Sequence, residues 1–459
     1  MRRSLLMTAV CSILFCFSAT LISQNTDSLI IRKFYTGALS NPVAWHNLGT
    51  LCKNFPGRLC GSKKVMEATS WIKQLLDRMD LDTVFLQPVM VKRWERGDKE
   101  IGKITSSKAG NHTLNVCVLG SSVGTGPDGI TAMVVEVQGF DDLKKLGRQK
   151  IEGKIVFFNR PADPSFIYTF GAYGSAVDQR VFGAMQAARY GAIAVVVRSA
   201  TLAQSDDPHT GIQHYADSVK AIPALGISTN DADKLSAWLK RDPALKLFLR
   251  TTCKEQPEVL NYNIIAELRG TEKPKEIIAF GGHIDSWDIE QGAHDDGVGV
   301  MQTIEVLRLF KTLDIKPKHT IRVVVFIDEE YAQRGAAAYA AFAKDNGRHI
   351  AAIESDRGGF TPQGFSIDAP DETVKKIQNW KPLLLPYNLW FIEKGGSGVD
   401  IRDLKPFGVP LIALVTDSQR YFDYQHAASD TFDKVHPREM QLGSAAIASL
   451  VFLIDQYGL

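Results

Sequence analysis

The side chains with the clearest capacity for chemistry lie in GGHIDSWDIEQGAHDDGVGV, residues 281–300. His283, Asp285 and Asp295 occur there among glycines, directly after the apolar run Ile277–Phe280. Imidazole and carboxylate groups are common protein ligands of divalent metals such as zinc. An apolar run that ends in such residues is typical of a buried strand that delivers ligands to the edge of a sheet. This stretch therefore predicts a metal site.

Three later apolar runs end in residues of the same types. Glu329-Glu330 follows 320–327, Asp356 follows 350–353, and His426 lies in the loop after 410–415. Carboxylates gathered out of water are costly unless a cation lies among them. A pair of metal ions would share one carboxylate, take further ligands individually, and leave one carboxylate free to accept a proton from water.

The elements that must position these residues alternate between strand and helix through the second half of the chain. Helices are expected at Gly297–Thr312, Gly335–Lys344 and Pro437–Tyr457, with strands between them. This alternation predicts an α/β fold, with a mostly parallel mixed sheet flanked by helices. Ligands of such sheets bind at the carboxyl ends of the strands, where the candidate residues lie.

Residues 115–253 have a different pattern of apolar residues and turns. Short apolar runs such as KIVFF and AIAVVV alternate with glycine turns, and one helical stretch is expected at Val181–Tyr190. The pattern predicts a self-contained β-rich unit.

The first residues have the composition of an export signal. Arg2 and Arg3 precede an uncharged apolar run, Leu5–Ile22. Cleavage near Ser23 would release a periplasmic or secreted protein, with no membrane contact thereafter. The run approaches the roughly 20 residues that span a bilayer, so an uncleaved segment would act as an anchor.

Charge and cysteine content narrow the function classes further. The 459-residue chain carries 53 Lys and Arg against 51 Asp and Glu, and its basic residues are scattered, which argues against nucleic acid as a partner. Cys52, Cys60, Cys117 and Cys253 remain after the leader. Two disulfides or four buried thiols are both compatible with the sequence.

Taken in order, these motifs resemble one known family. HIDSWDIEQGAHDDGVG, then Glu329-Glu330, then ESDRGG and a late His426, is similar to the co-catalytic zinc exopeptidases, which include bacterial aminopeptidases and glutamate carboxypeptidases. The Ser-Trp-Asp after His283-Ile284-Asp285 most resembles the plasma glutamate carboxypeptidase branch. NFPGRLCGS and NIIAELRG extend the resemblance over nearly all the mature chain, and GKIVFF…IPALGIS resembles a protease-associated domain.

The resemblance assigns a role to each candidate residue. It implies two Zn²⁺ per chain: His283 and Asp356 hold one, Glu330 and His426 hold the other, and Asp295 bridges both. It makes Glu329 the general base for a bridging hydroxide, and Asp285 the partner of the second ring nitrogen of His283. The peptide bond between Asp295 and Asp296 is expected to be cis. His294 is not expected to bind metal, and Asp400 is expected either to support the site or to contact substrate.

The domain organisation follows from the same comparison. We expect a signal peptide at 1–23, the N-terminal part of the catalytic domain at 25–113, a protease-associated insert at 114–255 and the di-zinc domain at 256–459. The expected activity is that of an exopeptidase or dipeptidase acting on small peptides, in a possible homodimer. Which peptide terminus is recognised is left open.

Three other functions are compatible with the same fold. A glutaminyl cyclase type of acyltransferase would use a single zinc, and a deacylase of N-acyl amino acids would use the same metals on another amide. A catalytically inactive binding protein would lack some ligands, whereas all of the expected ligands are present in this sequence.

Overall fold

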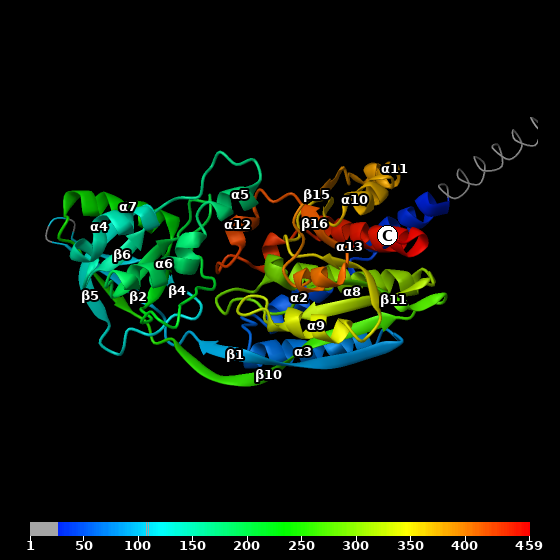
Figure 1. Ribbon diagram of the computed structural model, residues 1–459, viewed down its shortest axis with the longest axis horizontal. Helices are drawn as coiled ribbons and strands as arrows, with labels where there is room; N and C mark the ends of the chain where they lie inside the picture. The colour runs from blue at the N-terminus through cyan, green and yellow to red at the C-terminus, as the bar shows by residue number, and fades with distance from the viewer. Residues whose placement is uncertain (1–25, 107, 109) are drawn as a thin grey trace, which may run out of the picture.

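The computed structural model describes residues 26–106, 108 and 110–459. The predicted signal peptide, residues 1–23, lies outside the described residues. No helix in the described ranges is both long enough and apolar enough to cross a membrane. The described chain forms a main sheet and a second sheet, each with helices packed on it (Figure 1).

The main sheet carries the candidate residues. Its strands occur in the order β1 (Thr83–Glu95), β10 (Lys254–Leu268), β12 (His319–Phe326), β11 (Lys273–His283), β13 (Arg348–Glu354), β16 (Leu411–Thr416), β14 (Pro362–Asp368) and β15 (Phe391–Lys394). The central strands β12, β11, β13 and β16 run parallel. β1 and β10 pair antiparallel with their neighbours, and β14 pairs antiparallel with β16 but parallel with β15. The predicted α/β fold with a mixed, largely parallel sheet is confirmed.

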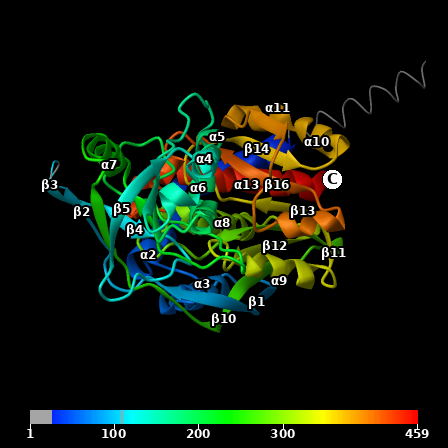
Figure 2. The same cartoon turned by 60° about the vertical axis from the view of Figure 1, so that its left-hand side comes forward.

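Helices bury both faces of this sheet. Successive residues of a strand point to opposite faces, so each strand contributes to both cores. In β11, Ile278 and Phe280 pack into the large core beneath α8, while Ile277 and Ala279 pack under α9. The large core takes the 26–40 helix, α2 (Val43–Asn54), α3 (Lys63–Asp77), α8 (Val298–Thr312), α10 (Asp371–Gln378) and α13 (Pro437–Tyr457). The opposite face takes α9 (Arg334–Ala343) and the 3-10 helix η3 (Arg402–Phe407). Figure 2 shows α9 in the half of the molecule away from β2 and β3.

Some elements differ from the expected ones. The apolar periodicity of residues 28–51 in the sequence predicts one helical segment, but the structure has two helices there, because Asn41-Pro42 interrupts the helix before α2. β14 was not expected, since its glycine and its short apolar run give a weak strand pattern. Short elements complete this part: α11 (Lys381–Leu384), η2 (Leu385–Tyr387), α12 (Tyr421–Tyr424) and η4 (Phe432–Lys434).

The second sheet is formed by chain between β1 and β10. Its order is β3 (Gly110–Leu114), β2 (Ile101–Ser106), β9 (Lys246–Arg250), β5 (Ile130–Val137), β6 (Ile155–Phe158), β7 (Ala194–Arg198), β8 (Ala224–Ile227) and β4 (Val116–Val118). β2 and β3, which were expected in the N-terminal part of the catalytic domain, pair with this sheet. Figure 1 shows β1 and β10 running along the lower edge of the molecule toward it.

The expectation of a single helix in this second unit was wrong. It contains α4 (Phe140–Ile151), α5 (Thr169–Gly174), α6 (Asp178–Arg189) and α7 (Thr229–Arg241). α4 buries only Leu143 and Ile151, and many of its other residues are charged. The short buried stripe is therefore difficult to recognise as a helix in the sequence. The protease-associated character of the unit stays a prediction.

The cysteines resolve one open alternative. Cys52, Cys60, Cys117 and Cys253 are all buried free thiols in the described chain. Burial raises the pKa of the Cys52 and Cys117 thiols to about 12, so both stay protonated and behave as small apolar side chains.

Candidate metal centre

The candidate residues converge where the parallel strands end. His283 is the last residue of β11, Glu329 and Glu330 follow β12, and Asp356 follows β13. His426 reaches the same place from the loop after β16, by way of α12. The neighbouring strands run parallel, so their carboxyl ends meet at one edge of the sheet.

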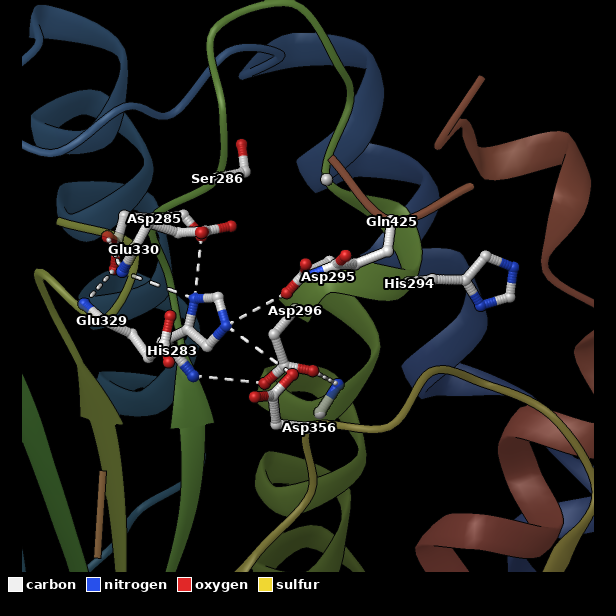
Figure 3. A network of polar contacts seen from close by, with 12 residues as sticks. His283, Asp285, Ser286, His294, Asp295, Asp296, Glu329, Glu330, Asp356 and Gln425 are labelled. Carbon is white, nitrogen blue, oxygen red and sulfur yellow. Dashed lines mark hydrogen bonds and ion pairs between the residues drawn. The ribbon is translucent and has the colours of Figure 1, made fainter. Parts of the chain in front are cut away.

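Asp295 lies between the two histidines. Its Oδ1 is 3.3 Å from His283 Nε2, and its Oδ2 is 3.3 Å from His426 Nε2. His283 Nε2 is also 3.7 Å from Asp356 Oδ1, and His426 Nε2 is 2.9 Å from Glu330 Oε2. Figure 3 shows the His283 ring directed at Asp295 and Asp356. The residues of the predicted ligand set therefore lie together in space.

The donor set forms two clusters that have the composition of metal sites. Asp295, Glu330 and His426 form one, and His283, Asp356 and Asp296 form the other. Asp296 is a weaker ligand candidate than Asp295, because its oxygens already accept the main-chain N–H groups of His283 and Gly299, at 3.1 and 3.0 Å.

Several atoms at this centre are buried without a hydrogen-bond partner among the described residues. They are His283 Nε2, Asp295 Oδ2 and Glu330 Oε1. Buried polar atoms nearly always have hydrogen-bond partners in folded proteins. A group of unpaired polar atoms at one place therefore indicates a site for a bound ion or molecule. The chemistry of the donors fits a divalent cation.

The carboxylates of the cluster differ in how readily they ionise. Burial raises the pKa of Glu329 well above its usual value, and the nearby Glu330 and Asp356 reinforce that rise. Burial also opposes ionisation of Asp295, but the adjacent imidazoles of His283 and His426 outweigh it and lower the pKa of Asp295. Glu329 therefore has the raised proton affinity that a general base needs, and Asp295 remains an anion.

The comparisons with known proteins agree with this geometry. A model of peptidase family M28 matches residues 263–451. Carboxypeptidase Q of Bos taurus is 34% identical over 412 residues, which cover 90% of this chain and 85% of that protein. The Mus musculus carboxypeptidase Q is 34% identical over 432 residues, which cover 94% and 89%. The chain belongs to peptidase family M28. It is therefore a metallo-exopeptidase, in agreement with the family that the sequence motifs predicted.

Solved structures extend the relationship to the whole fold of this M28 peptidase. The crystal structure of a peptidase M28 precursor from Shewanella amazonensis matches with a TM-score of 0.90 and 30% identity, over 94% of this chain and 97% of that one. A zinc aminopeptidase from Bacillus subtilis matches with a TM-score of 0.63 at 17% identity, over 89% and 93%, and so shares the fold.

Asp285 acts in the M28 centre differently from the expectation. His283 Nδ1 donates to the main-chain oxygen of Asp285 at 3.0 Å, while the Asp285 carboxylate is 3.8 Å away from that nitrogen. The carboxylate instead accepts the main-chain N–H groups of Asp328 and Glu330, at 2.9 and 3.3 Å. Asp285 thus fixes the ring of His283 through its carbonyl and the turn that carries the expected base through its side chain.

Two residues hold the main chain around the M28 centre in a way that the sequence did not reveal. Arg58, which is fully buried, donates to the carbonyls of Ile284, Gln291 and Gly292 at 2.7, 2.6 and 2.9 Å. Asp430 accepts the main-chain N–H groups of His294 and Asp295 at 2.8 and 3.1 Å. The arginine lies in the quoted NFPGRLCGS loop, but its partners are main-chain atoms, which no side-chain pattern reveals.

The remaining candidates fall at the margins of the M28 centre. His294 points away from the cluster (Figure 3) and stacks on Phe360 at 4.4 Å. Burial lowers the pKa of His294 to about 4, so it is a neutral packing residue. Tyr421 donates toward Asp356 Oδ1 at 3.4 Å.

Asp400 is buried beside Glu354, and neither of its carboxylate oxygens has a partner in the described chain. The peptide bond between Asp295 and Asp296 is cis, as the resemblance implied.

The second unit of this M28 peptidase also reaches the centre. Arg180 Nη1 of α6 lies 3.2 Å from His426 Nδ1, and the Thr210 N–H donates to the His426 carbonyl at 2.8 Å. The first of these contacts joins residues 246 positions apart. Nothing in the sequence pattern indicates either contact.

Proposed function

We propose that this chain is an exported zinc-dependent exopeptidase or dipeptidase that hydrolyses the peptide bonds of small peptides. The observation that carries the proposal is the position of Asp295, which has one carboxylate oxygen 3.3 Å from each of two histidines. A carboxylate that faces two ligand clusters at once is the arrangement that a pair of metal ions requires.

His283 and Asp356 would hold one zinc ion, Glu330 and His426 the other, and Asp295 both. Support comes from the orphaned buried atoms of His283, Asp295 and Glu330. The indole N–H of Trp287 donates to Glu330 Oε2 at 2.7 Å and so orients that carboxylate. Bound zinc ions would lower the pKa of a water molecule and polarise the peptide carbonyl of the substrate.

Within this scheme the chain itself moves the proton. Glu329 is half-buried, and its raised pKa suits it to take a proton from the attacking water and return it to the leaving amine. Asp285 holds the turn on which Glu329 lies, so the base is fixed relative to His283.

The substrate class is inferred from the relatives. Curated relatives named carboxypeptidase Q, and solved structures described as aminopeptidases, support small peptides as substrates. The N-terminal composition supports export to the periplasm or beyond. We also propose that the unit built on the second sheet is a protease-associated domain. A homodimer stays a prediction.

Metal analysis combined with peptide cleavage tests this proposal. Purified protein should contain two zinc ions per chain and should hydrolyse members of a panel of free dipeptides, N-blocked peptides and aminoacyl chromogens. Glu329→Gln should keep the metal and lose at least about 100-fold in kcat, since general-base catalysis contributes that much or more.

The same experiment separates the other functions. One zinc per chain with cyclisation of N-terminal glutamine would favour the acyltransferase. Cleavage of N-acyl amino acids alone would favour the deacylase, and a metal-free protein without turnover would favour the inactive binding protein.

A further inference from the structure

Arg357 directly follows Asp356 at the rim of the metal centre. The Asp356 side chain is 19% exposed, whereas Asp295 and Glu330 are 4% and 3% exposed. The centre therefore opens on the side of Asp356. Arg357 is half-buried, and the exposed glycines Gly395 and Gly396 lie beside it.

The Arg357 side chain is held in place by neutral groups. Its guanidinium carbon lies 5.2 Å from the centre of the Phe170 ring, and its Nη2 donates to the Gly396 carbonyl at 3.4 Å. Its own carbonyl accepts the Thr416 hydroxyl at 2.6 Å. A guanidinium carries five N–H donors, so most of the donors of Arg357 have no partner among the residues that the structure describes.

Phe170 belongs to α5 of the second unit and connects Arg357 to the centre. It stacks on Tyr421 with ring centres 5.7 Å apart and meets Phe422 edge-on at 4.8 Å. Tyr421 in turn donates toward Asp356 Oδ1. The second unit is fixed here by the Thr169 hydroxyl, which donates to the Ser418 carbonyl at 2.6 Å. Both structural units thus position the arginine.

The nearest carboxylates are already committed elsewhere. Glu354 accepts the main-chain N–H groups of Val399 and Ile401 at 2.9 and 3.0 Å. Asp356 is directed at His283 and Tyr421. In the described part of the chain no acidic side chain forms an ion pair with Arg357. Asp356 and Glu354 act on the Arg357 charge only from beyond ion-pair distance. A half-buried guanidinium without a direct ion pair at the opening of a site has the character of an anion receptor.

Arg180 is a further cation near the centre, but it is enclosed. Its Nη1 contacts His426 Nδ1 and the Thr210 carbonyl, and its buried Nε has no partner in the described chain. Arg180 as a residue is only 8% exposed, and its side chain lies against Gly211, where an added Cβ would be 2.4 Å from the guanidinium carbon. Arg180 is enclosed beside His426, whereas Arg357 is open to a ligand.

We propose that Arg357, seated on Phe170, binds a carboxylate of the peptide substrate and so makes the enzyme selective for acid-bearing small peptides. This inference rests on the proposed function. The carboxylate is either the free C-terminus of a short peptide or an acidic side chain, because both present the same planar pair of oxygens to a guanidinium.

Matched peptides distinguish the two sources. Ala-Leu and its C-terminal amide differ only in the terminal carboxylate, and the amides of Ala-Glu and Ala-Gln differ only in the side chain. The wild type should prefer one carboxylate-bearing member by about 10- to 100-fold in kcat/KM, mainly through KM, as expected for one charged hydrogen-bonded contact. Preference within the first pair identifies the C-terminus, and preference within the second identifies the side chain.

Variants then assign that preference to the arginine. Arg357→Ala should abolish it by weakening only the carboxylate-bearing peptide, and Arg357→Lys should restore part of it. Arg420→Ala is the matched control, because Arg420 also lies over a phenylalanine ring, Phe360 at 4.9 Å, but has Glu439 within 3.7 Å. It should keep the wild-type preference.

Binding and metal content provide a second readout. Calorimetric titration of Ala-Leu, or of the Ala-Glu amide, into metal-loaded Glu329→Gln should show the same loss of affinity when Arg357→Ala is added, with zinc content unchanged. Equal losses for both members of a pair, or no loss, would overturn the inference and leave the peptidase proposal standing. Absence of cleavage of every peptide in the panel by the wild type would instead refute the proposed function.

Discussion

The carboxylate of Asp285 accepts the main-chain N–H of Asp328 at 2.9 Å and that of Glu330 at 3.3 Å. The main-chain oxygen of the same residue accepts the ring N–H of His283. One buried residue thus fixes both the expected metal-binding histidine and the turn that bears the expected base. The relative placement of ligand and base depends on it.

Asp285→Asn should weaken zinc binding by about 10- to 100-fold, the usual loss when the support of a metal ligand is altered. The amide keeps the shape of the side chain but puts an NH₂ group or a weaker acceptor opposite the two main-chain donors. Competition with a chromogenic chelator measures the affinity. Asp371→Asn, at an exposed position of α10, is the control and should bind zinc like the wild type. Unchanged affinity in Asp285→Asn would contradict the supporting role.

Arg58→Met should destabilise the protein by about 3 kcal/mol, because it strips the buried carbonyls of Ile284, Gln291 and Gly292 of their donors. Urea unfolding followed by circular dichroism gives the free energy of unfolding. Arg148→Met removes an exposed pair with Glu152 and should stay within about 0.5 kcal/mol of the wild type. Similar losses of unfolding free energy in the two variants would show that the buried hydrogen bonds of Arg58 stabilise the protein no more than the exposed ion pair does.

Metal removal should lower the melting temperature. The acids of the centre are buried together, so a cation that binds only the folded state stabilises it by mass action. Dialysis against a chelator should reduce Tm by about 5 °C or more, and zinc in excess should restore it. Scanning calorimetry follows both steps. The combined variant His283→Ala/His426→Ala should melt at the same temperature with and without zinc, and a retained zinc response would place the metal elsewhere.

His349 provides a pH effect that is separate from the metal centre. Burial, with help from Arg322, lowers the pKa of His349 to about 4, against an ordinary value of about 6.5. The unfolded chain therefore binds a proton that the folded chain refuses, so stability falls as the pH drops from about 6.5 to about 4. His349→Gln should flatten that part of the curve by on the order of 3 kcal/mol at the acid end, and exposed His46→Gln should not. Parallel curves for all three proteins would refute the assignment.

The convergence of the candidate residues could be predicted because it follows from the alternation of strands and helices, whereas their metal binding stays a prediction. An apolar run that ends in His283 or Glu329 must be a strand that stops at the sheet edge, and parallel neighbours bring such ends together. The long apolar pattern of Pro437–Tyr457 likewise matched α13 without error. In both cases one periodicity decides the structure.

The contributions of the second unit could not be predicted in this way. Arg180 and Phe170 reach the centre through the packing of two sheets, which depends on side-chain shape rather than on periodicity. The role of Asp285 depends on which of its oxygens lies nearer to the His283 ring, a matter of less than 1 Å that no spacing rule encodes.

The central claim is that Asp295 lies between two metal ions. Anomalous diffraction at the zinc absorption edge, from crystals grown with zinc, tests it most directly. The account predicts two peaks about 3.5–4 Å apart, one beside His283 and Asp356 and one beside Glu330 and His426, with an oxygen of Asp295 directed at each. A single peak, or two peaks without Asp295 between them, would contradict it.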